Sequence, residues 1–152
     1  RIGYNYRMSN VIAGIGRGQL MHLEEHLRLK KAIYQRYREA FSDIREISMN
    51  PLNPRGDANN WLSCMTIREG CDVTPDQVMD ALDAENIESR PIWKPMHLQP
   101  VFAGYEFFNH NESGVSVSED IFARGVCLPS DIKNTDADMD QVIGIVRGLF
   151  NR

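Results

Sequence analysis

The sequence lacks long hydrophobic runs, because its apolar stretches are only a few residues long. A transmembrane helix needs about 20 consecutive apolar residues, so we expect no membrane-spanning segment. An excess of positive charge is also missing, with 17 basic against 21 acidic residues and a formal net charge of −4. Binding to a nucleic-acid backbone requires a basic surface, so we expect no nucleic-acid partner. No charged-then-apolar leader is visible, and the start at Arg1 without Met predicts a piece of a longer protein.

Cysteine is scarce, and its spacing argues against both a disulfide framework and a zinc site. Cys64, Cys71 and Cys127 are odd in number, lie far apart and include no Cys-x-x-Cys pair. This pattern is typical of reduced thiols, with Cys64 and Cys127 as core residues among apolar neighbours. It predicts a cytoplasmic protein.

Familiar catalytic and nucleotide-binding signatures are absent or match only in form. The three glycines at 14–18 have the wrong spacing for a dinucleotide-binding loop, and no strand precedes them. The hydrolase motif G-x-S-x-G does not occur. Residues 22–26, His-Leu-Glu-Glu-His, match a zinc-peptidase pattern, but their flanks are rich in Lys and Glu, as on a solvated helix face. A zinc site needs a third protein ligand in a fitting context, so we predict no metal.

A strong helical pattern occupies residues 9–42. Apolar residues recur there at steps of three and four, which predicts one long helix or two joined helices. Ser9 or Asn10 can cap its start. Each glycine at 14–18 costs about 1 kcal/mol relative to Ala inside a helix, which an element packed tightly against that face would offset. The glycines therefore predict a close helix–helix or subunit contact.

The rest of the chain has the pattern of alternating short strands and helices. A Pro- and Gly-containing loop is expected at 43–60, strands at 61–67, 87–93 and 126–128, and helices at 74–85, after Ser116 and from Thr135. The irregular stretch 94–115 is of a length that often carries function. The predicted fold class is α+β or α/β, with a small mixed or antiparallel sheet covered by helices. We expect two parts: 1–42, an N-terminal segment with a long interface helix, and 43–152, a small C-terminal α/β domain.

Three polar residues are candidates for ligand binding. The amide of Asn5 can donate two hydrogen bonds to a phosphate without adding charge, although an Asn before a helix is more often a turn or capping residue. Arg7 offers a planar fork for phosphate or carboxylate, whereas most arginines form surface or interface ion pairs. His97 lies in a Pro-flanked loop that would hold its imidazole toward a ligand oxygen, and a packing role is an equal alternative.

Two segments resemble the DegT/DnrJ/StrS family of pyridoxal phosphate (PLP)-dependent sugar aminotransferases. Residues 3–8, Gly-Tyr-Asn-Tyr-Arg-Met, are similar to the family's Gly-x-Asn-x-Arg-Met segment. Residues 90–97, Arg-Pro-Ile-Trp-Lys-Pro-Met-His, are similar to its Arg-x-x-Trp-x-Pro-x-His stretch. Ser118-Glu119 and residues 127–129, Cys-Leu-Pro, extend the likeness over essentially the whole chain. It looks closest to the branch that aminates the 4-keto group of UDP-linked sugars.

The resemblance implies a fold, a reaction and three roles. The fold would be the C-terminal small domain of an aspartate-aminotransferase-type (fold type I) enzyme. The reaction would be PLP-dependent transfer of an amino group, expected from glutamate, to a nucleotide-linked keto sugar in glycan or exopolysaccharide biosynthesis. In the family the matching Asn contacts the PLP phosphate across a homodimer interface, so Asn5 is the expected cofactor-binding residue. Arg7 and His97 are the expected substrate-binding residues of the same shared active site.

The family's catalytic lysine has no counterpart in this chain. None of the available lysines follows a Ser/Asn-rich lead like the family's lysine motif; they are Lys30, Lys31, Lys94 and Lys133. PLP chemistry needs a lysine amine, and in the family both that lysine and the Asp that pairs with the pyridinium nitrogen lie upstream. We therefore assign no catalytic residue and expect the chain alone to be inactive. The alternative is a non-catalytic binding or oligomerisation module, with the long first helix as its interaction surface.

Overall fold

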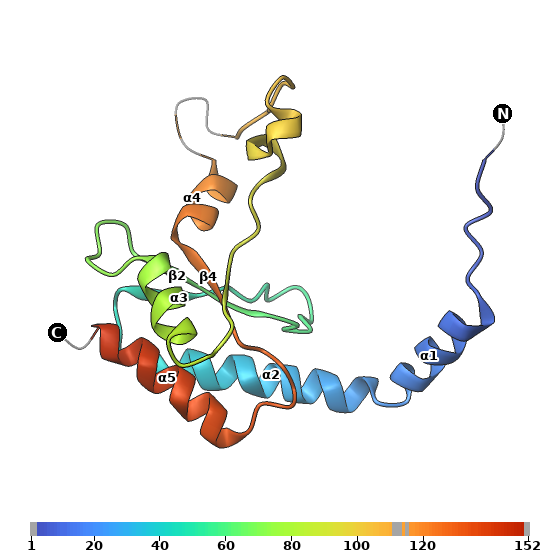
Figure 1. The fold of residues 1–152 in the computed structure, drawn as a ribbon, viewed down its shortest axis with the longest axis horizontal. Coiled ribbons are helices and arrows are strands. Elements are labelled where there is room, and N and C mark those ends of the chain that lie inside the picture. Colours follow the sequence, from blue (N-terminus) through green and yellow to red (C-terminus); the bar gives the residue numbers. More distant parts are fainter. Residues whose placement is uncertain (1–2, 111–113, 115, 151–152) are drawn as a thin grey trace.

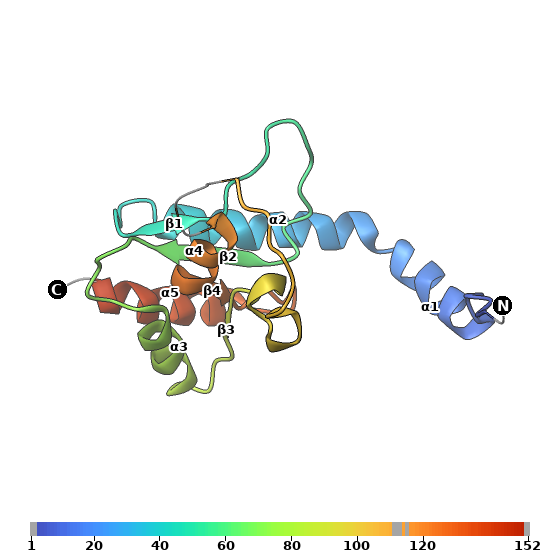
Figure 2. The same cartoon turned by 90° about the horizontal axis from the view of Figure 1, so that it is seen from above.

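The structure is a computed structural model that describes residues 3–110, 114 and 116–150. It consists of a body and an N-terminal extension that stands away from it (Figure 1, Figure 2). The extension comprises residues 3–9 and helix α1 (Asn10–Leu20), and no residue of α1 is buried. The body begins with α2 (Leu23–Ala40), which carries side chains into the hydrophobic core. Among the described residues, no helix is long and apolar enough to cross a membrane.

A four-stranded sheet forms the centre of the body. Its strands are β1 (Ile47–Met49), β2 (Ser63–Ile67), β3 (Arg90–Pro91) and β4 (Gly125–Leu128). They lie in the order β1-β2-β4-β3, and each neighbouring pair is antiparallel. Met65 on β2 stands opposite Val126 on β4, and both side chains are fully buried. The expected α+β class with a small antiparallel sheet is confirmed.

Helices cover this sheet and supply much of the core. Besides α2 these are α3 (Pro75–Asp83), α4 (Val117–Arg124) and α5 (Asp136–Phe150), with short 3₁₀ helices η1 (Met96–Leu98) and η2 (Pro100–Phe102). Helix α3 packs against α5 and β4, whereas α2 and α4 each contact β2. Their buried side chains meet in one cluster that includes Tyr37, Met65, Leu82, Leu128 and Val146. Burial of a large apolar side chain contributes about 1.5–3 kcal/mol, so this cluster holds helices and sheet together.

Local capping signals set the starts of three helices. The hydroxyl of Ser9 accepts a backbone N–H from the first turn of α1 at 3.3 Å. Thr74 and Ser116 each form a complete capping box with the residue three positions later, Gln77 before α3 and Glu119 before α4. These boxes satisfy backbone groups that have no partner inside the helix. The predicted starts of α1, α3 and α4 are confirmed.

Long-range hydrogen bonds join α2 to the end of β4 and to α5. The hydroxyl of Tyr37 donates to the carbonyl of Pro129 at 2.8 Å. Arg147 on α5 donates to both carboxylate oxygens of Asp43, at 2.7 and 2.8 Å, and also to the carbonyl of Ala40 at the end of α2. These contacts anchor α2 to the body. The domain division at residue 42 stays a prediction.

Some elements differ from the sequence-based expectation. The helical region 9–42 is two helices, the second of the two alternatives, because a turn at residues 21–22 separates α1 from α2. The loop expected at 43–60 contains β1, and a three-residue strand is too short to show an alternating pattern. The strand expected at 87–93 is reduced to the two residues of β3, and Pro91 has no N–H with which to extend the pairing.

Cys64 and Cys127 stand opposite each other on β2 and β4, with their Sγ atoms 3.5 Å apart as free thiols. Cys127 is buried, as predicted for a core residue, whereas Cys64 is only half-buried. The hydrogen bond from Cys127 raises the pKa of the Cys64 thiol, so this thiol stays protonated at neutral pH.

Candidate active-site residues

Residues 3–9 form an extended arm before α1, and its side chains are exposed. The rings of Tyr4 and Tyr6 pack edge to face, with centroids 5.9 Å apart. Tyr6 has a positive φ of 51°, which is uncommon for a residue other than glycine. The arm therefore has a local shape of its own without burying any described side chain in the body.

Asn5 is held by a local turn in which its Oδ1 accepts the backbone N–H of Arg7 at 2.8 Å. Because this turn occupies the amide oxygen, the amide nitrogen Nδ2 and its two hydrogens are left for a ligand. The guanidinium of Arg7 is exposed, and within the described part of the chain it forms no ion pair. The two residues lie together on the arm and both present donors suited to an anion.

His97 lies in η1, directly after Pro95 and Met96, in the irregular segment expected to carry function. Its Nε2 is 2.8 Å from Oε1 of Glu119 on α4, and the two side chains are only 15% and 27% exposed. The imidazole also stacks on the ring of Phe107, with centroids 3.6 Å apart and planes 14° from parallel. His97 is therefore fixed both by packing and by a hydrogen bond.

The His97 ring forms one wall of a small, mostly apolar pocket of about 260 Å³. The other lining residues are Met96, Phe102, Tyr105, Glu106 and Phe107. Sequence reasoning placed Glu119 in the family likeness and did not connect it with His97. Its contact with a histidine 22 residues away has no local sequence signal, so it could be found only from the structure.

Trp93 belongs to the wall of a second pocket. Its ring lies 5.6 Å from that of Trp61, with the planes tilted by 32°, and both side chains are exposed. With Arg90, Ile92 and Phe122 they line a cavity of about 610 Å³ on the outer side of β3 and β4.

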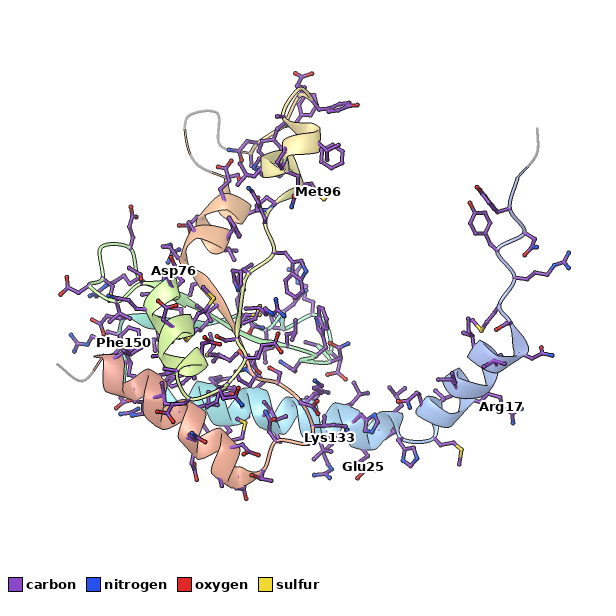
Figure 3. The ribbon with its side chains drawn as sticks, viewed as in Figure 1. Arg17, Glu25, Asp76, Met96, Lys133 and Phe150 are labelled. Carbon is purple, nitrogen blue, oxygen red and sulfur yellow. The ribbon has the colours of Figure 1, made fainter. Side chains whose placement is uncertain are left out.

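The three predicted ligand-binding residues do not form one site within the described part of a single chain. Asn5 and Arg7 are on the arm beyond the free end of α1, and Figure 1 and Figure 2 both place this arm away from the body. His97 follows Met96, which Figure 3 shows at the top of the body, apart from the arm at the right of the view. One chain thus presents two separate sets of polar groups.

The His-Leu-Glu-Glu-His segment lies at the junction of α1 and α2. The rings of His22 and His26 stack with centroids 6.0 Å apart, and Nδ1 of His22 is 3.9 Å from a carboxylate oxygen of Glu25. Over residues 3–110, 114 and 116–150, no three or more potential metal ligands come together.

The lysines occupy structural or solvent-exposed positions. Lys30 donates to two backbone carbonyls, one at 3.1 Å, and Lys31 pairs with Asp57 at 2.6 Å. Lys94 and Lys133 are exposed to solvent. None of these four lysines lies on the arm that carries Asn5 and Arg7.

Fold and polar groups together define a class: a small α+β domain whose extended arm presents the amide of Asn5 and the guanidinium of Arg7 away from its own body. Comparison with known proteins identifies the family. The DegT/DnrJ/EryC1/StrS aminotransferase family matches residues 1–147, and the chain belongs to it. The resemblance seen in the two sequence segments is confirmed, and with it membership of a sugar aminotransferase family.

Named relatives match nearly the whole chain. EpsN of Bacillus subtilis (strain 168), described as a pyridoxal phosphate-dependent aminotransferase, is 39% identical over 99% of this chain and 38% of its own length. GDP-perosamine synthase of Caulobacter vibrioides is 33% identical over 93% of this chain and 37% of its own length. The spore coat polysaccharide biosynthesis protein SpsC of Bacillus subtilis is 27% identical over 97% of this chain and 38% of its own length. The chain therefore spans less than two fifths of the length of these relatives.

Solved structures agree on the fold. A DegT DnrJ EryC1 StrS aminotransferase from Brucella abortus superimposes with a TM-score of 0.83 at 27% identity, over 100% of this chain and 38% of that protein. DesV of S. venezuelae gives a TM-score of 0.85 at 22% identity, over 100% of this chain and 39% of that protein. This is a likeness of fold alone. The fold implied by the resemblance, the small domain of a fold type I PLP-dependent enzyme, is confirmed.

Proposed function

We propose that this chain is the small domain of a PLP-dependent sugar aminotransferase and supplies ligand-binding residues to an active site shared across a homodimer. The reaction is transfer of an amino group, from glutamate, to a nucleotide-linked keto sugar in polysaccharide biosynthesis. One observation carries the proposal: the turn at Asn5 leaves amide donors free on an arm that its own body does not use. Family membership and the activities of the named relatives support it.

The groups on the arm fit the phosphate of PLP. The Nδ2 group of Asn5 offers two N–H donors and no charge, which suits one corner of a phosphate dianion. Arg7, two residues on, offers a charged fork for a diphosphate or a carboxylate. When bound, PLP supplies the carbonyl that takes up the amino group and a ring that accepts electrons. In the proposal, Asn5 holds the phosphate and Arg7 binds the nucleotide sugar or the amino donor.

His97 is assigned to the sugar substrate. Its ring lines a mostly apolar pocket of about 260 Å³ together with Tyr105 and Glu106, and an imidazole nitrogen there can orient a sugar oxygen. In the proposal His97, like Asn5 and Arg7, acts across the interface in the active site of the neighbouring subunit.

Complementation between two inactive subunits of the intact enzyme tests the cross-subunit role. One subunit carries Asn5→Ala and the other lacks the catalytic lysine. In a mixed dimer both defects fall in one site and the other site is whole, so activity should return on mixing. If subunit exchange is verified and no activity returns, the assignment of Asn5 across the interface is wrong.

The effect of Asn5→Ala alone should fall on cofactor retention. Loss of a charge-assisted hydrogen bond costs about 1.5–3 kcal/mol, or roughly ten- to a hundredfold in PLP affinity. Asn53→Ala is the matched control, because Oδ1 of Asn53 also accepts a backbone N–H two residues on, from Arg55 at 2.9 Å, in an exposed loop. The control should retain PLP like the unaltered enzyme.

We also propose that the isolated chain does not turn over substrate, because no lysine lies beside the arm. The test is incubation with PLP, borohydride reduction and peptide mapping. Scattered low-level labelling of exposed amines such as Lys94 and Lys133 is expected. Stoichiometric labelling of one specific lysine would show that the chain holds its own catalytic amine.

A non-catalytic oligomerisation module is the second candidate function, favoured by the absence of any buried residue in α1. Mass spectrometry of the native protein separates the two, because an enzyme subunit should extend upstream by a domain with lysine-bound PLP. A cytoplasmic location is part of the main proposal and is supported by the free thiols.

A further inference from the structure

The contact between His97 and Glu119 belongs to a series of hydrogen bonds that starts in the backbone of α4. Oε1 of Glu119 is 2.8 Å from Nε2 of His97. Oε2 accepts the backbone N–H of Ser116 at 3.0 Å, and the Ser116 hydroxyl accepts the backbone N–H of Glu119 at 3.2 Å. The start of the helix therefore orients the carboxylate, and the carboxylate in turn contacts the imidazole.

The charge state of Glu119 decides which imidazole nitrogen carries the hydrogen. The N–H of Ser116, and next the ring of His97, lower the pKa of the Glu119 carboxyl, so it is ionised at neutral pH. An ionised carboxylate only accepts hydrogen bonds, so Nε2 of His97 must be the donor. In a neutral imidazole the other nitrogen, Nδ1, then has a free lone pair. Within the described residues no hydrogen bond to Nδ1 is found.

Phe107 limits the rotation of the imidazole that would exchange the two nitrogens. The two rings stack with centroids 3.6 Å apart and planes 14° from parallel, so the plane of His97 is set by packing. Glu119 sets which edge of the ring points toward α4. Of the two ring nitrogens, Nδ1 is therefore the one left for a ligand, and the ring itself lines the pocket of about 260 Å³.

We propose that Glu119 is a positioning residue that holds His97 in its Nε2–H tautomer, so that Nδ1 accepts a hydrogen bond from a hydroxyl of the sugar substrate. The identity of this ligand rests on the proposed function, whereas the tautomer is a property of the chain itself. A neutral histidine without such a partner populates both tautomers and presents a donor or an acceptor. Glu119 removes this ambiguity.

Glu119 has a second role as the capping-box residue of α4, so a useful variant must keep the cap. Glu119→Gln does so, because Gln occupies the same position in α3, where Oε1 of Gln77 accepts the backbone N–H of Thr74 at 2.9 Å. In the variant the single side-chain oxygen is needed by Ser116. The NH₂ group then faces His97 and donates to Nε2, which moves the ring hydrogen to Nδ1.

Nitrogen-15 NMR of the histidine ring in the 152-residue chain at pH 8 measures this tautomer directly. We expect Nε2–H for His97 in the unaltered chain and Nδ1–H in Glu119→Gln, with the Ser116 backbone amide resonance retained. Asp138→Asn is the control, because Asp138 accepts the backbone N–H of Thr135 at 2.8 Å in a cap without histidine. It should leave the His97 tautomer unchanged. An Nδ1–H form in the unaltered chain, or no change in Glu119→Gln, overturns the inference.

Kinetics of the intact enzyme test the ligand separately. With a UDP-linked 4-keto hexose as the probe, Glu119→Gln should raise KM about ten- to a hundredfold, because a donor replaces the acceptor opposite a substrate hydroxyl. The half-reaction with glutamate should not change. An inverted tautomer with unaltered sugar kinetics overturns the substrate role of His97 in the proposed function. An unaltered tautomer overturns the positioning role of Glu119 whatever the kinetics.

Discussion

Replacement of Gly125 by alanine should destabilise the body and disturb the segment that leads to His97. Gly125 joins α4 to β4, and a Cβ at this position would lie 2.2 Å from Cγ1 of Ile92 and 2.5 Å from the carbonyl oxygen of Ile121. Real Cβ contacts essentially never fall below 3.0 Å, so the segment after β3 or the last turn of α4 must move. Overpacking costs about 1–3 kcal/mol of stability. We expect a loss at the upper end of this range, because the Ile121 oxygen belongs to the backbone and cannot move aside as a side chain can.

Urea unfolding followed by circular dichroism measures this loss. A change of about 3 kcal/mol lowers the urea midpoint by roughly 1–3 M for slopes of about 1–3 kcal/mol/M. The control is Gly144→Ala, the same change on the exposed side of α5, where the added Cβ meets nothing within 4 Å. Because Ala is favoured over Gly in a helix by about 1 kcal/mol, the control should be stabilised.

A double variant separates the two contacts of the added methyl group. Ile92→Ala removes the Cγ1 atom but leaves the Ile121 carbonyl, so Gly125→Ala should cost less in the Ile92→Ala background than alone. An unchanged midpoint for Gly125→Ala alone would refute the close packing. A similar loss in Gly144→Ala would show that the effect reflects glycine replacement in general.

Other properties follow from the contacts already described. Tyr37→Phe should lower the free energy of unfolding by about 1–3 kcal/mol, because the Pro129 carbonyl loses its donor; an unchanged urea midpoint would contradict this. The Arg147 guanidinium lowers the pKa of Asp43 from 3.8 to about 2. A lowered folded-state pKa stabilises the protein above pH 4, and this stability is lost as the pH falls toward 2. In Asp43→Asn the free energy of unfolding should therefore depend less on pH between 4 and 2. The same pH dependence in the variant and the unaltered protein would contradict this role of the Asp43–Arg147 contact. The exposed apolar side of α1 should drive dimers or larger oligomers in sedimentation equilibrium, and Ile15→Glu should weaken them. A clean monomer at high concentration with α1 ordered would contradict this prediction.

Most helices were predictable because their signals are local. The capping boxes at Thr74 and Ser116 each lie within four consecutive residues, and the helices with their periodic apolar residues begin directly after them. The sheet was harder to predict, because β1 and β3 are short and acquire their identity only by pairing with neighbours distant in the chain. No propensity indicates that Cys64 would stand opposite Cys127, since that depends on register.

The candidate site shows the same division. Asn5 and Arg7 lie two residues apart, so a turn between them is within reach of sequence reasoning, although their proposed roles came from the family resemblance. The partner of His97 could not be inferred, because Glu119 reaches it only when η1 and α4 are brought together in the folded body. The place of Glu119 in a capping box gives no indication that its side chain also contacts His97.

The sheet ends at both edges in strands too short to accept a further strand. β1 has three residues, and β3 has two, one of which is Pro91 with no N–H to offer. Long exposed edges recruit strands from other molecules, whereas short edges and proline prevent this. Copies of the chain should therefore meet through the apolar side of α1 and not by joining sheets. At high concentration the protein should form helix-mediated assemblies of defined size instead of fibrils.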